Sequence, residues 1–224
     1  IGAEPHSEEQ RKRIEQLLGV KAYNCFGMSE MNGPGVAFEC TEQNGLHIWE
    51  DNVIVEIVDP VTLQPVPEGE VGELVLTTIN REAMPLLRYR TRDLTCILPG
   101  DCPCGRTHKR LARFKGRSDD MIILKGVNLF PIQIEKILMQ FKELGSNYMI
   151  TLETIGNSDE MLIEVELSDL FTDDYSALQR LTKGITRQLK DELLLTPRIK
   201  LVAKGSLPTT DGKAVRVKDH RKLC

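Results

Sequence analysis

The chain has 224 residues, of which 41% are hydrophobic, and this length suits one large or two small domains with a real core. Its 29 Lys and Arg against 33 Asp and Glu give a net charge of −4, which argues against a general nucleic-acid-binding protein. No apolar run reaches the roughly 18 residues of a membrane span, and the first residues lack the basic-then-apolar pattern of a signal peptide.

The cysteines indicate the redox environment of the protein, and the first residues bear on the length of its polypeptide. Six cysteines are spread along the chain without the spacing of a secreted disulfide framework. We therefore expect a reducing, cytoplasmic environment. The sequence opens on IGAEP without an initiator Met, and on this ground we expect it to be cut from a longer polypeptide.

The first predicted helix begins after Ser7, which is a favourable N-cap residue. Gln10 would complete a capping box, and Gly19 would end the helix. The apolar stripe of this helix would consist of Ile14, Leu17 and Leu18.

A β-rich region follows, because short runs rich in β-branched residues alternate with Pro- and Gly-containing breakers. The predicted strands are LHIW at 46–49, VIVEIV at 53–58, ELVLTT at 73–78 and LTCIL at 94–98. They predict a small unit of hairpins.

From about residue 119 onward the sequence predicts a separate α+β unit. A strand at 121–124 leads through a loop to a helix that begins at Pro131, a favourable first helical residue. Two further strands, a long helix from about Asp173 to Leu193 and a last strand at 199–203 complete it. We therefore predict two domains, 1–117 and 118–224, each of ordinary domain size.

Two cysteines in a CPC stretch, together with distant Cys and His residues, suggest a metal site. Cys102 and Cys104 could join Cys40 and His47 around Zn²⁺, with His108 as a substitute ligand, because thiolates and imidazoles suit this ion. Such a site would be structural and would fix the β-rich region. The alternative is free thiols without a metal.

Five short stretches occur in a fixed order. They are GAEP at 2–5, FGMSE at 26–30, YRTRD at 89–93, GRSDD with a following KG at 116–126, and PTTDGK at 208–213. Each alone can be an ordinary turn, a solvated loop or a surface charge cluster. Their order and spacing together favour one shared function.

With GLHIWED, CPCGRTH and GKAVRV beside them, these stretches resemble the adenylate-forming acyl-CoA ligases, and within them the phenylacetate-CoA ligases and related aryl-acid ligases. The resemblance covers essentially the whole chain. It implies an α/β and α+β architecture: the end of a large AMP-binding domain with a β-rich subdomain, then a small C-terminal lid domain. It also implies ATP, Mg²⁺ and coenzyme A as reactants and cofactors of an acid–thiol ligase that forms an acyl adenylate.

The resemblance also assigns roles at the nucleotide. Phe26 and Gly27 match positions against adenine, Ser29 a phosphate contact and Glu30 the Mg²⁺ carboxylate, an oxygen ligand that suits this ion. The adenine turn would consist of Gly2, Ala3, Glu4 and Pro5. The remaining nucleotide residues would be Asp93, which accepts the ribose hydroxyls, and Arg117.

Three further residues match moving or reacting parts. Lys213 matches the lysine that bridges the substrate carboxylate and the α-phosphate, Asp119 the hinge of the lid, and Gly126 a glycine of the coenzyme A tunnel. A flexible ammonium can touch both anions as charge moves between them. Gly126 can also be a simple turn residue.

The family's Ser/Thr/Gly-rich phosphate loop is absent from this sequence. We therefore expect the chain to need a missing N-terminal part of the same enzyme and to show little ligase activity alone. The alternatives are a noncatalytic nucleotide-binding module, an enzyme that loads a carrier-protein thiol, and a zinc-stabilised interaction domain. Phenylacetate, indoleacetate and benzoate-like acids all remain open as substrates, and the oligomeric state stays open with a homodimer as one option. Neither nucleic acid nor a membrane is expected as a partner.

Overall fold

The computed structural model describes residues 1–31, 33–169, 175–209 and 214–221. The chain forms two compact units, the first made of residues 1–5 and 20–120, the second of 6–19 and 121–224. Each unit has its own buried hydrophobic core. The predicted fold class, mixed α/β and α+β with a β-rich part, is confirmed. The domain division at 117 and 118 stays a prediction.

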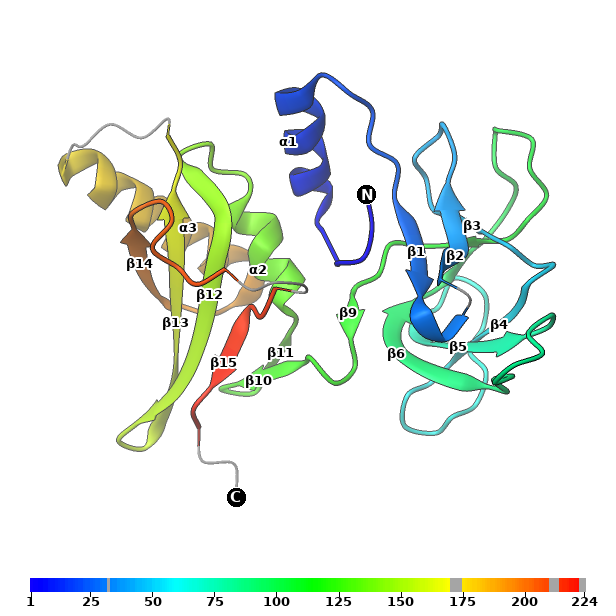
Figure 1. The fold of residues 1–224 in the computed structure, drawn as a ribbon. Coiled ribbons are helices and arrows are strands. Elements are labelled where there is room, and N and C mark those ends of the chain that lie inside the picture. Colours follow the sequence, from blue (N-terminus) through cyan, green and yellow to red (C-terminus); the bar gives the residue numbers. More distant parts are fainter. Residues whose placement is uncertain (32, 170–174, 210–213, 222–224) are drawn as a thin grey trace. The chain divides into compact units, whose positions relative to one another are not determined.

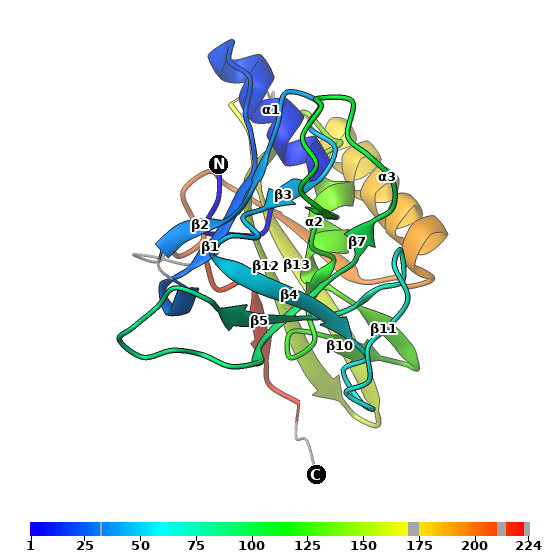
Figure 2. The same ribbon diagram turned by 90° about the vertical axis from the view of Figure 1, so that its right-hand side faces the viewer.

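The first unit consists almost entirely of antiparallel strands (Figure 1). One sheet has the order β1-β2-β3-β8-β7 and the other β4-β5-β6-β9. Figure 2 shows β4 and β5 side by side. The elements are β1 Cys25–Met28, the 3-10 turn η1 Ser29–Met31, β2 Gly33–Glu39, β3 Leu46–Ile48, β4 Val53–Val58, β5 Gly72–Thr78, β6 Tyr89–Thr95, β7 Ile97–Leu98, β8 Arg110–Leu111 and β9 Gly116–Arg117.

The predicted strands of the β-rich region are confirmed, and their apolar residues fill the core of the first unit. Leu46, Leu74, Leu76 and Leu111 are fully buried. The sequence reading missed β1 and β2, and it also missed that the YRTRD stretch lies inside β6. Thr91 of this stretch is buried, Tyr89 and Asp93 are half-buried and Arg92 is exposed, so only part of the stretch lies at the surface.

A buried carboxylate ties β5 to β6. Glu73 is fully buried, and Arg90 donates to its two carboxylate oxygens over 2.9 and 2.6 Å. Arg90 also donates to the carbonyl of Pro60 over 3.1 Å. Because a buried carboxylate is costly without partners, this fork is what makes Glu73 tolerable in the core.

We expect Glu73→Gln to lower the free energy of unfolding by about 1–2 kcal/mol, since the amide keeps only part of the fork with Arg90. Urea unfolding of the purified chain measures this. Glu56→Gln is the matched control, because Glu56 pairs with Arg88 across exposed surface at 3.1 Å. That change should alter stability by no more than about 0.5 kcal/mol. Equal effects of the two changes would contradict the account.

The second unit combines helices with a four-stranded mixed sheet of order β14-β13-β12-β15 and a hairpin of β10 and β11. The long antiparallel pair β12 and β13 forms its centre (Figure 1), and β14 and β15 flank it in parallel. The elements are α1 Glu8–Leu18, β10 Ile122–Leu124, β11 Val127–Leu129, α2 Pro131–Leu138, β12 Leu144–Ile155, β13 Ser158–Leu167, α3 Tyr175–Leu193, β14 Arg198–Val202 and β15 Val217–Asp219.

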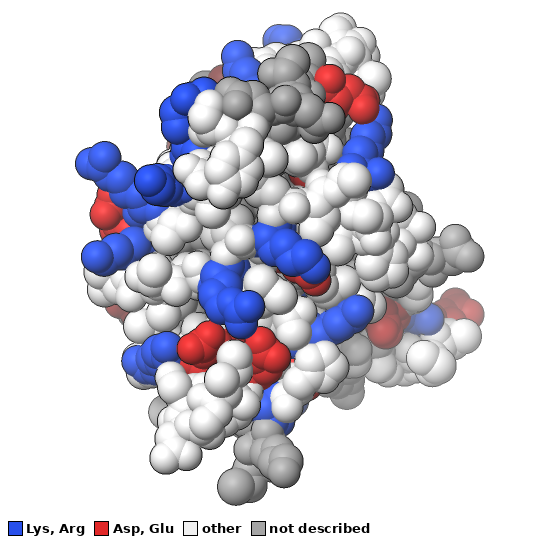
Figure 3. All heavy atoms as spheres, turned by 90° about the vertical axis from the view of Figure 1, so that its left-hand side faces the viewer, with Lys and Arg blue, Asp and Glu red and all other residues white. Residues whose placement is uncertain are grey.

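The two helices predicted for this unit are present, and each buries one apolar face. Helix α2 begins with Pro131 and buries Ile134 and Ile137, while α3 buries Leu181, Ile185 and Leu189 at a spacing of one turn. The predicted start of the long helix at Asp173 lies outside the described residues. Figure 3 shows Lys and Arg interspersed with Asp and Glu over the face it draws.

The first helix exists as predicted, but its packing differs. Leu17 and Leu18 are 75% and 69% exposed, and the residue it buries is Arg11. Arg11 can be buried because Glu8 and Glu15 both pair with its guanidinium. The predicted apolar stripe is therefore wrong.

The predicted capping box of this helix forms only by half. Ser7 Oγ accepts from the Gln10 backbone at 3.2 Å, but the Ser7 N–H donates to Glu135 at 2.9 Å instead of to Gln10. The stretch after Lys125 and Gly126 is also strand β11, not a loop. Both turn residues have positive φ, which suits a tight hairpin. Within the described parts of the chain, none of the helices combines the length and apolar character of a membrane span.

Candidate functional site

Residues 2–5 run beside the start of β1. The Cys25 backbone N–H donates to Ile1 O over 2.8 Å, and a Cβ on Gly2 would lie 2.7 Å from the Cys25 carbonyl oxygen. Ala3 has a φ of 70°, which is uncommon for a residue with a side chain. This close approach explains the glycine and holds the backbone of Glu4 and Pro5 in a defined turn.

The FGMSE stretch forms β1 and the turn η1. Phe26 is half-buried and packs against Phe114, with the ring centroids 4.4 Å apart and the rings tilted by 40°. Ser29 is exposed, and the Glu30 carbonyl accepts a hydrogen bond from Arg81. Among the described residues the Glu30 carboxylate makes no ion pair.

The strongest charge cluster of the motif residues lies where β6 pairs with β9. Asp93 and Arg117 are direct register partners, with Arg117 Nη1 3.8 Å from the Asp93 carboxylate. Arg117 also donates to both oxygens of Asp119, over 2.9 and 2.8 Å. One guanidinium thus contacts both the proposed ribose carboxylate and the proposed hinge.

Two neighbours position this cluster. The β5–β6 pairing is irregular between Glu73 and Val75, and Arg92 has a φ of 69° at this point. Thr91 Oγ1 donates to Leu74 O at 3.0 Å and accepts from the Asp93 N–H at 3.1 Å. A bulge of this kind re-aims the following side chain, here Asp93.

The surroundings of Asp119 and Asp120 shift the pKa values of their carboxyl groups in opposite directions. The hydrogen bonds from Arg117 hold the pKa of Asp119 below its ordinary value. Burial raises the pKa of Asp120, and the nearby Asp119 charge adds to this. At neutral pH the Arg117–Asp119 fork is therefore fully charged.

The remaining predicted ligase residues lie elsewhere. Gly126 sits in the β10–β11 turn of the second unit with a φ of 80°, and a Cβ built there meets no atom within 4 Å. Lys213 lies outside the described residues. An ion pair and hydrogen bonds join Asp93, Arg117 and Asp119. Phe26 lies in β1 of the other sheet, and Ser29 lies in the turn η1 that follows it.

The four predicted zinc ligands come together in the first unit. The donor atoms of Cys40, His47, Cys102 and Cys104 all lie within 4.8 Å of one another. The ring of His108 is not among them; its backbone carbonyl lies 3.3 Å from His47 Nδ1 instead. The four side chains named from the sequence therefore lie together, and zinc binding by them stays a prediction.

Within the Cys–His group of Cys40, His47, Cys102 and Cys104, the local environment shifts the pKa values in different directions. Burial raises the pKa of the Cys40 thiol and lowers that of His47, which favours the neutral imidazole. The backbone N–H of Arg106 is the main cause that lowers the pKa of Cys104, to about 7. Of Cys40 and Cys104, the half-buried Cys104 therefore has the more easily ionised thiol.

The sequence reading missed Thr91, Arg81 and Arg106 as supporting residues. Thr91 lies inside the YRTRD stretch, and its hydroxyl joins the Leu74 carbonyl to the Asp93 backbone. Only a strand assignment for this stretch could have indicated it. Arg81 and Arg106 carry no signal in the sequence beyond their charge.

Comparisons with known proteins identify relatives of this chain. Residues 126–221 match the family described as AMP-binding enzyme C-terminal domain. Phenylacetate-coenzyme A ligases from Thermus thermophilus and Pseudomonas putida are 43% and 44% identical to this chain over 99% of its residues. The chain covers 53% and 50% of those two proteins and so spans about half the length of the curated relatives it matches.

A solved structure is similar to most of the chain. It is 2-hydroxyisobutyryl-CoA ligase in its postadenylation state in complex with R3-HIB-AMP. The similarity has a TM-score of 0.87 with 32% sequence identity, and it covers 94% of this chain and 45% of that chain.

Proposed function

The chain belongs to the adenylate-forming acyl-CoA ligases, among the phenylacetate-CoA ligases, and on this premise we propose that its polypeptide joins an aryl carboxylic acid to coenzyme A at the expense of ATP. The observation that carries the proposal is the identity of 43% to a phenylacetate-coenzyme A ligase along 99% of the chain. In the first half-reaction a substrate carboxylate oxygen attacks the α-phosphorus of ATP and releases pyrophosphate. In the second, the coenzyme A thiol attacks the acyl carbonyl and releases AMP.

The first unit supplies the nucleotide contacts in this proposal. Asp93 accepts the ribose hydroxyls, for which an ionised carboxylate with two oxygens is suited. Arg117, its register partner, contributes positive charge beside the nucleotide. Phe26 packs on adenine and Gly27 lets the backbone come close, while residues 2–5 line the pocket and Ser29 contacts phosphate.

Glu30 fits a magnesium ion. Glu30 lies inside the short 3-10 turn η1 and is half-buried. Mg²⁺ prefers hard oxygen ligands, together with substrate phosphates and water. When bound there, the ion would neutralise phosphate charge. The chain's own part is to hold that carboxylate at the end of β1, which the hydrogen bond from Arg81 to the Glu30 carbonyl supports.

Residues 118–224 act as the lid in this proposal. Asp119 is the hinge that absorbs the backbone change between half-reactions, and its fork with Arg117 couples the hinge to the nucleotide cluster. Gly126 lines the path of the coenzyme A arm, where its open surroundings leave room for a chain of atoms. Lys213 bridges the carboxylate and α-phosphate during adenylation.

The proposed substrate is a phenylacetate-like acid, because the relatives above are named for phenylacetate. The test is to incubate the polypeptide that carries this chain with ATP, Mg²⁺, coenzyme A and one acid at a time, and to detect acyl-CoA by mass spectrometry. Phenylacetate, indoleacetate, benzoate and acetate form the panel. We expect aryl thioesters with release of AMP. Thioester from acetate alone, or from no acid of a broad carboxylate panel, would contradict the proposal.

A further inference from the structure

Three separate segments of the first unit contribute the Cys–His cluster. Cys40 follows β2 directly, His47 lies in β3, and Cys102 and Cys104 lie in the segment between β7 and β8. Cys40, His47 and Cys102 are buried, and Cys104 is half-buried. Side chains that are 62 residues apart in the sequence therefore meet because β2, β3, β8 and β7 are neighbours in one sheet.

The spacing of the donor atoms suits a tetrahedral ion. Cys40 Sγ and Cys102 Sγ are 3.6 Å apart, and Cys104 Sγ lies 3.4 Å from His47 Nε2. Zinc bonds to thiolate and imidazole imply edges of about 3.8 Å between two sulfurs and about 3.6 Å between sulfur and nitrogen. Two of the six edges therefore match a zinc tetrahedron closely, and the other donor pairs lie within 4.8 Å of one another.

The orientation of His47 also fits a metal ligand. Its Nδ1 lies 3.3 Å from the backbone carbonyl of His108, so that a proton on Nδ1 is donated to this oxygen. The Nε2 lone pair then points toward Cys104. Metal-bound histidines commonly donate their second ring N–H in this way, which fixes the tautomer and the ring orientation.

Backbone amides support two of the sulfurs. The N–H of Glu42 is directed at the Cys40 sulfur, and the N–H of Arg106 at the Cys104 sulfur. Both are two residues beyond the cysteine. Gly105 has a φ of 81°, and its N–H donates to Cys102 O over 3.0 Å, which closes a turn. This turn directs the Arg106 N–H toward the Cys104 sulfur. Such amides stabilise thiolates.

We propose that Cys40, His47, Cys102 and Cys104 bind one structural Zn²⁺ ion that fastens the segment between β7 and β8 to β2 and β3. Four protein ligands complete the tetrahedron, so the ion has no open position for a substrate. None of these residues belongs to the proposed nucleotide or coenzyme A contacts. The zinc site therefore stands or falls independently of the ligase proposal.

The chief competitor is a disulfide between Cys40 and Cys102. Their sulfurs would have to approach from 3.6 Å to about 2.05 Å. A disulfide would also leave the convergence of His47 and Cys104 unexplained. The zinc site uses all four side chains.

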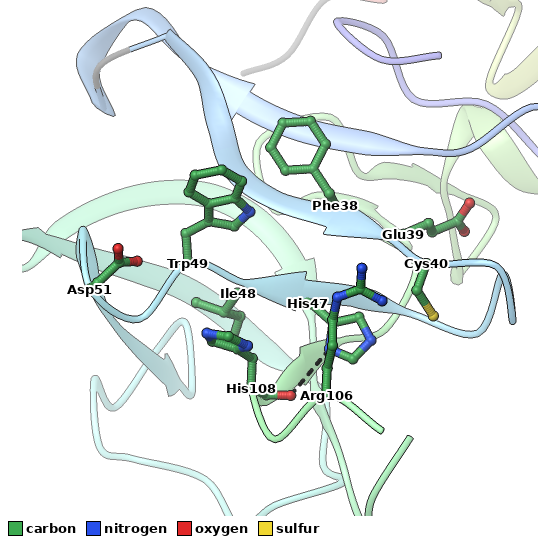
Figure 4. A pocket seen from close by; sticks show the side chains of 9 residues that line it. All are labelled: Phe38, Glu39, Cys40, His47, Ile48, Trp49, Asp51, Arg106 and His108. Atoms are coloured by element: carbon green, nitrogen blue, oxygen red, sulfur yellow. Dashed lines mark hydrogen bonds between the residues drawn. The ribbon is translucent and has the colours of Figure 1, made fainter. Parts of the chain in front are cut away.

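A path for the ion exists at the surface. A pocket of about 350 Å³ reaches the cluster and is lined by Cys40, His47, Arg106 and His108, among others. Figure 4 shows the Cys40 sulfur and the His47 ring at this pocket, with the Arg106 side chain nearby. The cluster is thus open enough for a metal to enter and closed enough to hold it.

The test is to purify the chain from zinc-supplied medium under reducing conditions and to measure zinc by atomic emission. We expect one zinc ion per chain, retained on gel filtration. After EDTA removes it, Co²⁺ should bind and give thiolate-to-cobalt charge-transfer absorption. Cys40→Ser and Cys104→Ser should each lose the stoichiometric zinc. Cys104 is the half-buried ligand, so its serine variant disturbs the core least and keeps the test valid if Cys40→Ser does not fold.

Cys96→Ser is the matched control, since Cys96 is a buried thiol of the same unit outside the cluster. It should retain one zinc per chain. The absence of zinc from the wild-type chain, or zinc retained in both ligand variants, would overturn the proposal. A Cys40–Cys102 disulfide, found by peptide mass analysis of the chain purified under reducing conditions, would also overturn it.

Discussion

Replacing Lys213 by alanine is expected to reduce adenylation by roughly 10²–10³-fold, the usual cost of removing one group that stabilises transition-state charge. In our proposal its ammonium touches both the incoming carboxylate and the α-phosphate as negative charge moves between them. Thioester formation from a supplied acyl adenylate should keep most of its rate, because that step displaces AMP without forming the new phosphate bond. Single-turnover assays of each half-reaction measure the two rates separately.

Lys218→Ala is the control for this experiment. Lys218 is an exposed lysine of β15, five positions further along the chain, and the resemblance gives it no role. This change should leave both half-reactions within about twofold, as is usual for a surface substitution without special contacts. An equal loss of both half-reactions in Lys213→Ala would argue for a general folding defect and against the proposed role.

Replacing Glu166 by alanine is expected to cost about 3 kcal/mol of stability in the second unit, because several donors lose a buried charged acceptor at once. Glu166 is only 6% exposed. It accepts from the Leu207 backbone N–H over 2.9 Å and from the Asn147 amide over 3.1 Å. Asn147 in turn accepts from Arg216 over 2.8 Å, and the Arg216 guanidinium lies over the Tyr148 ring.

This network holds the chain on both sides of the lysine segment. Leu207 precedes it and Arg216 follows it, and both are fastened to the Glu166–Asn147 pair on β12 and β13. Glu166→Ala should therefore also lower the rate of adenylation. Urea unfolding and the adenylation assay measure the two effects. Glu164→Ala, which removes an exposed pair with Lys200, should change neither by much.

The pH dependence of this effect has a definite sign. Burial alone would raise the pKa of Glu166, but the hydrogen bonds from Leu207, Gly205 and Asn147 outweigh it and hold that pKa below its ordinary value of 4.5. A depressed carboxyl pKa stabilises the folded state above the ordinary value and ceases to do so as the pH falls through the folded value. The stability difference between wild type and Glu166→Ala should therefore shrink as the pH drops below 4.5. A difference that grows in acid would contradict this.

The secondary structure was largely predictable where the local signal was strong. Pro131 and the spacing of the apolar residues predict helices α2 and α3. The composition of the runs at 53–58 and 73–78 alone predicts strands. Strand β15 was not predictable, because its three residues VKD have no strand character and pair only with distant β12. Tertiary pairing decides such short segments.

The candidate sites were predictable to different depths. Cys and His chemistry was enough to name four side chains that lie together, although the contact of His47 with the His108 carbonyl depends on a fold that the sequence does not reveal. Asp93, Arg117 and Asp119 could be named singly from the motifs. Their fork across β6 and β9 could not be predicted, because it requires the register of two strands.

Exchange of radioactive pyrophosphate into ATP, without coenzyme A, is the most direct test of the ligase account. The polypeptide that carries this chain should catalyse exchange only when an aryl acid such as phenylacetate is present, since exchange reports the reversible formation of an acyl adenylate. Binding of ATP without exchange for any of a wide range of carboxylic acids would contradict the account and point to a noncatalytic nucleotide-binding protein.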